Sequence, residues 1–399
     1  MERDRLHPQC DYIEEKMIRK QAGFTMVELL ITMVIFVFTI AAASNIFVSL
    51  LTQFKQQSKI SETQIEGLVG TDVFRRDLEQ AGYGLPWVLS TDVTYNEGSG
   101  TTTSGIPAPN SNSFNDATAN PPRPFVSGDN IMGGSDYLVI KATSVSTDPA
   151  AMKWTSVVGT AGGGSQVKVW GSAAEDLIDG DYVISIIPTR GGSNQRILVS
   201  NVANFSVTFN QASFPVDYAP SIINDTYLVY GVNTGTALRM PFNRADYYIN
   251  RGATLPPRCA AGTGILVKTL ISHANGNRGT ELPLMDCVAD MQVIFALDRN
   301  GDGTAELYTG VLTDASGTAL TAQQIREQVK EVRVYVLAHE GQKDTTFTYV
   351  PPSPFVIPAS PDPASGAGRT FNFTTSGITD WQNYRWKVYR LAVQPNNIG

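Results

Sequence analysis

The stretch GFTMVELL (residues 23–30) and the apolar residues that follow it decide how this chain is organised. No charged residue occurs between Glu28 and Lys55. A helix over residues 29–54 would be roughly 39 Å long at about 1.5 Å per residue, enough to cross the ~30 Å hydrocarbon core of a bilayer. We therefore predict a membrane-spanning helix, with residues 24–51 as its transmembrane part.

The charges on the two sides of this helix predict its orientation. Lys16, Arg19 and Lys20 precede it, and almost no positive charge follows before Lys55. Because basic residues are retained on the cytoplasmic side of a membrane, we expect the N-terminus in the cytoplasm and the bulk of the chain outside it.

Gly23 and Glu28 stand in an order that an ordinary secretory signal does not have. In such a signal the small residue follows the apolar run and marks the cleavage site, whereas here Gly23 precedes it. Glu28 lies inside the segment that enters lipid, where an ionisable side chain costs about 2.5–3.5 kcal/mol and is usually retained for a partner. Cleavage after Gly23 would free the amine of Phe24, and its ammonium could pair with Glu28 of a neighbouring subunit.

These residues resemble the class III signal of type IV prepilins and pseudopilins, which has Gly before the cut, Phe after it and Glu at the fifth mature position. The resemblance implies that a prepilin peptidase removes residues 1–23 as a leader and that the Phe24 amine is then methylated. This leader is longer than the usual one, and Asp11, Glu14 and Glu15 give it a mixed charge. Met17 is therefore an alternative to Met1 as the true start.

The helix is predicted to continue into the head over residues 52–85. Apolar residues recur there at three- or four-residue spacing until glycine and proline stop the pattern at 82–86. The stripe expected to be buried comprises Phe54, Ile65, Leu68, Val69, Val73 and Leu78. Residues 90–127 are rich in Gly, Ser, Thr, Asn and Pro, and we expect them to form a long solvated loop.

Short runs rich in β-branched and aromatic residues predict strands in the rest of the head. They are residues 136–143, 166–170, 181–187, 205–209, 226–232, 265–271, 288–297, 332–337, 370–374 and 384–393. A short helix is predicted at 322–330, with Thr321 as its cap and Gln324 behind it. The expected fold is α+β and pilin-like: a long N-terminal hydrophobic helix followed by an elaborated antiparallel β-rich head over residues 86–399, with room for a subdomain at about 145–260.

Three further stretches resemble PilW-type minor pilins: RDLEQAGYG (residues 76–84), GSDYLVI (134–140) and YRWKVY (384–389). The acidic turn near Asp298 fits the same pattern. The resemblance implies a structural subunit that primes assembly of a type IV pilus, with other minor and major pilins and the assembly machinery of the inner membrane as partners.

The same resemblance implies a location, and two alternative functions stay open. Before assembly the chain would span the inner membrane once with its head in the periplasm; afterwards it would lie in the extracellular pilus near the tip, where it could affect adhesion and twitching motility. One alternative is a J-type pseudopilin of type II secretion. The other is a membrane-tethered calcium-binding adhesin that does not polymerise.

The cysteines favour a disulfide over a metal site. Cys10 falls in the leader, which leaves Cys259 and Cys287. In an exported head this pair is expected to form a disulfide, worth about 3–4 kcal/mol in the chain-entropy model; the alternative is two buried free thiols. Neither cysteine has a close second ligand in the sequence, so the spacing does not favour zinc.

A turn after residue 297 carries a partial calcium motif. Oxygen-bearing side chains occur at loop positions 1, 3, 5 and 9, namely Asp298, Asn300, Asp302 and Glu306, with Gly303 at position 6. Alternate oxygens of this kind can converge on a hard cation. Position 12 is Thr309 and lacks the closing carboxylate, so a bare Asn-Gly hairpin turn is the competing interpretation.

Composition and motifs argue against catalysis and against nucleic acid. The net charge of −7 would repel phosphate backbones. The two histidines that survive processing, His273 and His339, lie in no nucleophile or metal motif. We therefore expect a protein that is not an enzyme and that needs no cofactor, calcium apart.

Overall fold

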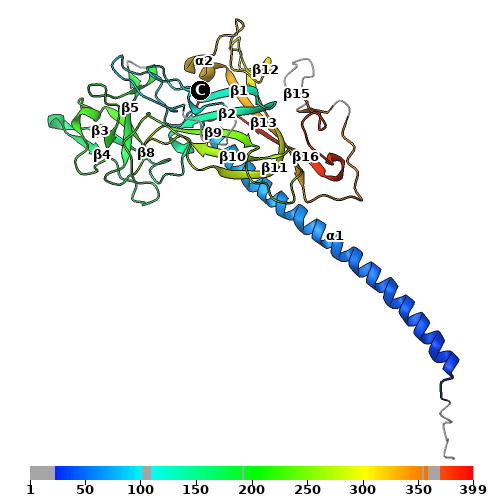
Figure 1. Ribbon diagram of the computed structural model, residues 1–399. Helices are drawn as coiled ribbons and strands as arrows, with labels where there is room; N and C mark the ends of the chain where they lie inside the picture. Colours follow the sequence, from blue (N-terminus) through cyan, green and yellow to red (C-terminus); the bar gives the residue numbers. More distant parts are fainter. Residues whose placement is uncertain (1–22, 101–108, 191–192, 353–354, 358–368, 399) are drawn as a thin grey trace, which may run out of the picture. The chain divides into compact units, whose positions relative to one another are not determined.

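The computed structural model describes residues 23–100, 109–190, 193–352, 355–357 and 369–398. The chain divides into two compact units, residues 1–55 and 56–399. Helix α1 (Met26–Gln80) runs through both (Figure 1). The predicted leader, including Cys10 and Met17, lies outside the described residues apart from Gly23.

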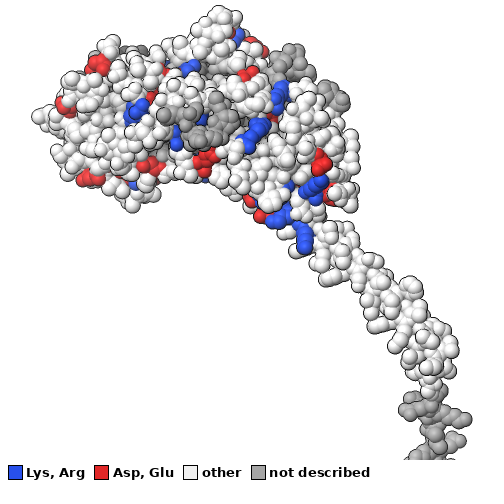
Figure 2. All heavy atoms as spheres, viewed as in Figure 1, with Lys and Arg blue, Asp and Glu red and all other residues white. Residues whose placement is uncertain are grey.

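The N-terminal unit consists of residues 23–25 and the first part of α1. Every residue from 23 to 55 is exposed. No charged residue lies between Glu28 and Lys55, and this stretch of the helix is accordingly white in Figure 2. By length and composition, α1 is a helix that could cross a membrane. Phe24 and Phe38 expose 82% and 71% of their surface, so nothing within this unit covers its apolar side chains.

The head is built around an eight-stranded antiparallel sheet with the order β1-β2-β9-β10-β11-β13-β16, in which β12 also pairs with β11. The strands are β1 (Phe125–Met132), β2 (Ser135–Ala142), β9 (Asn243–Asn250), β10 (Gly264–Leu270), β11 (Leu282–Leu297), β12 (Leu307–Thr309), β13 (Val329–Glu340) and β16 (Arg385–Val393). Helix α2 (Ala322–Gln328) precedes β13 and begins with the predicted capping box of Thr321 and Gln324. Strands β11 and β13 are the longest, and both are buried along most of their length.

A second, six-stranded sheet lies between β2 and β9 in the chain (Figure 1). Its strands are β3 (Trp154–Gly159), β4 (Ser165–Val167), β5 (Tyr182–Arg190), β6 (Ser193–Leu198), β7 (Val207–Thr208) and β8 (Thr226–Asn233). It falls within the range 145–260 in which the sequence leaves room for a subdomain. The chain leaves the larger sheet at Ala142 and re-enters it at Asn243, and these two residues are direct partners in the register.

The remaining regular elements are short. They are strands β14 (Val356–Ile357) and β15 (Arg369–Thr370), and 3-10 helices at Ser111–Phe114, Thr143–Val145, Ala161–Gly163, Val216–Tyr218 and Trp381–Asn383.

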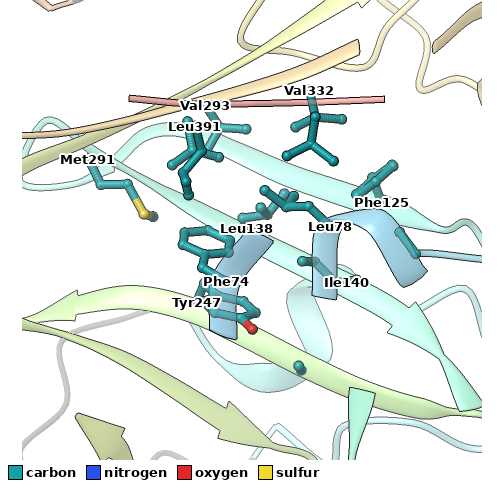
Figure 3. Packing of buried hydrophobic residues seen from close by; sticks show 14 of the residues in the cluster. Phe74, Leu78, Phe125, Leu138, Ile140, Tyr247, Met291, Val293, Val332 and Leu391 are labelled. Carbon is teal, nitrogen blue, oxygen red and sulfur yellow. The ribbon is translucent and has the colours of Figure 1, made fainter. Parts of the chain in front are cut away.

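The C-terminal part of α1 packs against the larger sheet. Phe74 stacks on Tyr247 of β9 with ring centroids 4.1 Å apart, and Leu78 lies among the apolar residues of the surrounding strands (Figure 3). Gly70 sits so close to β11 that a Cβ there would lie 1.8 Å from the carbonyl oxygen of Leu284. A glycine is therefore required at this contact.

The predicted buried stripe of this helix is wrong for most of its members. Phe54, Ile65, Leu68 and Val69 are all more than 60% exposed, whereas Leu78 is buried. The buried face instead comprises Thr63, Gly67, Gly70, Phe74, Asp77 and Leu78. Small and polar residues form the contact because the helix approaches the sheet closely, and apolar periodicity alone does not reveal such a face.

The expected solvated loop at 90–127 is also wrong in part. Val93, Tyr95 and Phe114 are buried in apolar clusters, and β1 begins at Phe125, inside the expected loop. Glu97 is fully buried and lies 2.8 Å from Lys141 Nζ. Residues 101–108 lie outside the described residues. The composition of this segment predicted an exposed, irregular backbone. A few buried side chains, such as Tyr95 and Phe114, are nevertheless enough to hold it against the head.

Candidate functional site

The candidate site begins at the predicted cleavage point. Gly23 and Phe24 precede helix α1 and are exposed. Thr25 and Glu28 form a reciprocal cap at the start of the helix: the Thr25 backbone N–H donates to Glu28 Oε2 at 2.9 Å, and the Glu28 N–H donates to Thr25 Oγ1 at 3.2 Å. The Thr25 hydroxyl also donates to Glu28 Oε2, at 2.9 Å.

This pairing is a capping box, in which a Thr and a Glu three residues later satisfy N–H groups that the helix cannot. The site residues predicted from the sequence include Glu28 but not Thr25, although the T-x-x-E spacing of these two residues is a capping-box signal. In the single chain the Glu28 carboxylate therefore caps its own helix. Its pairing with the Phe24 amine of a neighbouring subunit stays a prediction.

A second group of residues holds the helix to the head through Arg258. Its guanidinium Nη2 lies 2.5 Å from Oε2 of Glu66 on α1 and 2.8 Å from Oδ2 of Asp286 on β11. Cys259 and Cys287, the neighbours of Arg258 and Asp286 in the chain, are joined by a disulfide. The disulfide thus holds together two segments whose charged residues meet beside α1.

Asp77 provides a buried contact between the same helix and the sheet. Its carboxylate lies 2.5 Å from Lys268 Nζ and accepts a hydrogen bond from the Tyr247 hydroxyl. Burial raises the pKa of Asp77, while the Lys268 ammonium opposes that rise. Tyr247 on β9 and Lys268 on β10 offset the free-energy cost of burying this carboxylate.

The two histidines of the head are buried. His273 Nδ1 accepts from the Arg239 backbone N–H at 3.2 Å, and His339 Nε2 accepts from Ala260 N–H at 2.9 Å. Burial lowers the pKa of His273 to about 4 and that of His339 to about 3. Both imidazoles are therefore neutral near pH 7 and take part in packing.

Metal ligands come together at one place among the described residues. His339 lies with Cys259 and Cys287, their donor atoms within 4.8 Å of one another. Because the two sulfurs are bonded to each other, neither is the thiolate that a metal would require.

The predicted calcium loop forms a tight hairpin turn between β11 and β12. The two Asp298 carboxylate oxygens accept hydrogen bonds from the N–H groups of Gly301 and Gly303, at 2.6 and 2.8 Å. Asn300 and Asp302 likewise each accept from the backbone two residues further on, and Glu306 accepts from Arg299 N–H. Loop N–H groups thus occupy these oxygens, and calcium binding there stays a prediction.

The comparison with protein families agrees with the N-terminal geometry. The model of a family described as the prokaryotic N-terminal methylation motif matches residues 18–44, which include the cleavage point, Glu28 and the first half of the apolar segment. The searches of curated proteins and of solved structures give no match. The motif implies processing by a prepilin peptidase and association with the membrane and the pilus machinery. Together with the apolar helix that follows it, the motif supports the identification of this chain as a type IV pilin-like protein.

Proposed function

We propose that this chain is a minor pilin of the PilW type, a structural subunit that helps to prime a type IV pilus. The observation that carries the proposal is the exposed apolar part of α1 directly behind the methylation motif. A helix of this kind is costly to leave in water. It requires lipid before assembly and the helices of other subunits afterwards.

The head contributes a second apolar surface. Ile65, Leu68 and Val69 lie at helical spacing on α1 and are 61–65% exposed. They are separate from the face that packs on the sheet. In a filament this outer face would continue the subunit contact beyond the membrane segment, so helix packing would extend into the head.

The proposal includes the expected location and partners. The head would be periplasmic before assembly and would lie near the pilus tip afterwards, where it could affect adhesion and twitching. The role is mechanical, with no catalytic step and no cofactor other than calcium. A J-type pseudopilin would share the same processing and differ in the machine that it serves, whereas a tethered adhesin would never enter a filament.

Processing and filament recovery test the proposal. The chain would be expressed with and without a prepilin peptidase, and its N-terminus read by mass spectrometry. Sheared pili would then be probed for the head. We expect an N-terminus at methylated Phe24 and recovery in pili, with Gly23→Val as the uncleaved control. Cleavage without recovery in pili, combined with a secretion defect in a deletion strain, would instead identify a pseudopilin. An uncleaved protein confined to the membrane would leave the tethered adhesin.

A further inference from the structure

Two adjoining clefts meet at Trp87, seven residues beyond the end of α1. One has a volume of about 770 Å³ and the other about 450 Å³, and both are lined by Trp87, Gln323 and Arg326. The last two residues lie on helix α2. Volumes of this size are typical of sites for small organic ligands.

Two arginines lie over the Trp87 ring. The guanidinium carbon of Arg326 is 4.7 Å from the ring centroid and that of Arg196 is 5.7 Å from it. Among the described residues, neither guanidinium has a carboxylate within 4.0 Å. In a chain with a net charge of −7, two neighbouring cations without a counterion require an explanation.

Arg196 is the more unusual of the two. Its Nε and Nη2 atoms are buried without a hydrogen-bond partner. Four other arginines also have such nitrogens, but each of them has a carboxylate oxygen within 4.0 Å of its guanidinium group. They are Arg258, Arg278, Arg333 and Arg385. Of these five arginines, Arg196 is thus the one without a carboxylate partner among the described residues, although it lines neither cleft.

The backbone at Arg196 links this residue to Trp87. Its φ of 41° is in the left-handed region, which is strained for a side chain of this kind and is often found at functional positions. The Arg196 carbonyl accepts the Trp87 N–H at 2.9 Å. The strained residue thus positions the aromatic ring that both clefts share.

Burial is the main influence on the charge of Arg326. It lowers the pKa of Arg326 to about 10; the neighbouring Glu327 carboxylate opposes this shift, and the charge of Arg196 adds to it. An anion bound beside Arg326 would favour the charged guanidinium and raise its pKa. Lys330 also lines the larger cleft, but its ammonium lies 3.5 Å from an Asp298 carboxylate oxygen.

The other side chains in the clefts narrow the class of anion. Gln195, Gln323 and Asn120 offer amides, while Glu327 offers an exposed carboxylate. A polyphosphate chain would be repelled by Glu327, whereas sugar hydroxyls can donate to it. Trp87 is half-buried, and the part of its side chain that the two arginines leave uncovered offers an apolar surface to a sugar ring. An arginine fork suits a carboxylate.

From this arrangement we propose that the clefts around Trp87 bind an acidic saccharide, with its carboxylate at Arg326 and its ring beside Trp87. The proposal goes beyond the pilin role and does not depend on filament assembly. It gives the head a recognition site for uronic-acid-type sugars.

The test uses the full chain in detergent, with titration calorimetry. The probes are methyl β-glucuronide, its neutral counterpart methyl β-glucoside, inorganic phosphate and adenosine monophosphate. We expect the glucuronide to bind about tenfold or more tightly than the glucoside, because only the former carries the carboxylate. Phosphate and the nucleotide should bind more weakly than the glucuronide.

Matched variants locate the site. Arg326→Gln and Gln323→Ala should each reduce glucuronide affinity, the former by about tenfold or more. Arg390→Gln is the control: Arg390 is exposed and also lies over an aromatic ring, that of Tyr335, but lies outside both clefts. Unchanged melting temperatures would show that the variants fold. Equal binding of glucuronide and glucoside, tighter binding of phosphate or the nucleotide, or an Arg326→Gln variant that binds like the parent would each overturn the proposal.

Discussion

Glu28 has one observed partner, Thr25 of its own chain, and one proposed partner, the Phe24 amine of a neighbouring subunit. In the single chain its carboxylate accepts hydrogen bonds from Thr25. In a filament the methylated amine of Phe24 on another subunit would compete for the same oxygens. An amine carries a full charge, so in a site shielded from water it would be the stronger partner. The capping box would then hold the Glu28 carboxylate in one orientation until a neighbour arrives.

Two substitutions separate these roles. Thr25→Ala removes the hydroxyl of the cap and leaves the Glu28 carboxylate in place, so we expect pili to retain the protein. Glu28→Ala removes both interactions and should abolish incorporation while the head remains folded. Immunoblots of sheared pili measure incorporation, and protease resistance of the head measures folding. Equal loss in both variants would attribute the defect to helix capping alone.

The buried histidines predict how stability depends on pH. Their pKa values are lowered to about 4 and about 3 in the folded chain, whereas an unfolded histidine titrates near 6.5. The folded state therefore binds fewer protons, so its stability is complete above pH 6.5 and falls as the pH decreases toward 4. For His273 alone the loss approaches about 3 kcal/mol at the acid end.

Urea unfolding of the detergent-solubilised chain at pH 7, 6, 5 and 4.5 measures this dependence. His273→Gln should reduce the slope between pH 6.5 and 5. Burial raises the pKa of Asp136 to about 7, so this carboxyl also titrates in that range with an effect of opposite sign, and the comparison with the parent isolates the contribution of His273. A slope that is identical in the variant and the parent would show that His273 already titrates normally in the folded state.

At the scale of elements, the docking of α1 on the sheet depends on small residues. Gly67 faces the Tyr389 ring, and Gly70 faces the Leu284 carbonyl. Tight packing of this kind gains dispersion energy from backbone contacts, and it leaves the bulkier Ile65, Leu68 and Val69 outside. One face of the helix thus packs on the sheet, while the other keeps an exposed apolar surface.

Substitutions on the two faces should have opposite effects. Gly70→Val places a side chain 1.8 Å from the Leu284 oxygen, and we expect a loss of about 2 kcal/mol or more in the free energy of unfolding. Leu68→Ala on the exposed face should change it by less than about 0.5 kcal/mol but reduce recovery in sheared pili. Chemical denaturation measures the first quantity. A Gly70→Val variant as stable as the parent would contradict the close contact.

The sequence predicted elements whose pattern is local. Helix α2 with its Thr321 cap, and strands β2, β5, β8, β10 and β16, lie within two or three residues of the predicted ranges. It missed β1, β3, β6, β9, β12 and β14. Strand β9 is buried along its whole length although its sequence, NRADYYIN, contains Arg244 and Asp246. These two pair with each other at 2.7 Å, and a buried ion pair cannot be recognised without knowing the partner.

The candidate site residues also differ in whether a local sequence pattern reveals them. Gly23, Phe24 and Glu28 form a contiguous motif, so a single stretch of sequence identified them. Arg196, Arg326 and Trp87 are far apart in the chain and come together only because β6, α2 and the segment after α1 meet in the fold. Spacing arguments could not have found this group.

At the scale of the whole molecule, the division at residue 55 predicts an independent head. Within the described residues, the buried face of α1 begins at Thr63, so no core contact precedes Gln56. A chain starting at Gln56 should fold without detergent and remain monomeric by light scattering. A chain starting at Thr71 would lose Thr63, Gly67 and Gly70, and should melt at a lower temperature. Equal melting temperatures would show that this part of the helix adds nothing to the head.

The pairing of Ala142 with Asn243 has a consequence for how such a head can diversify. The chain that forms the smaller sheet leaves β2 and returns to β9 at one pair of neighbouring residues, so the smaller sheet is an insertion between two adjacent strands. Replacing or shortening such an insertion does not change the register between β2 and β9. Natural variants, or a laboratory graft at this junction, can therefore exchange one outer surface for another while the scaffold and its long helix stay the same.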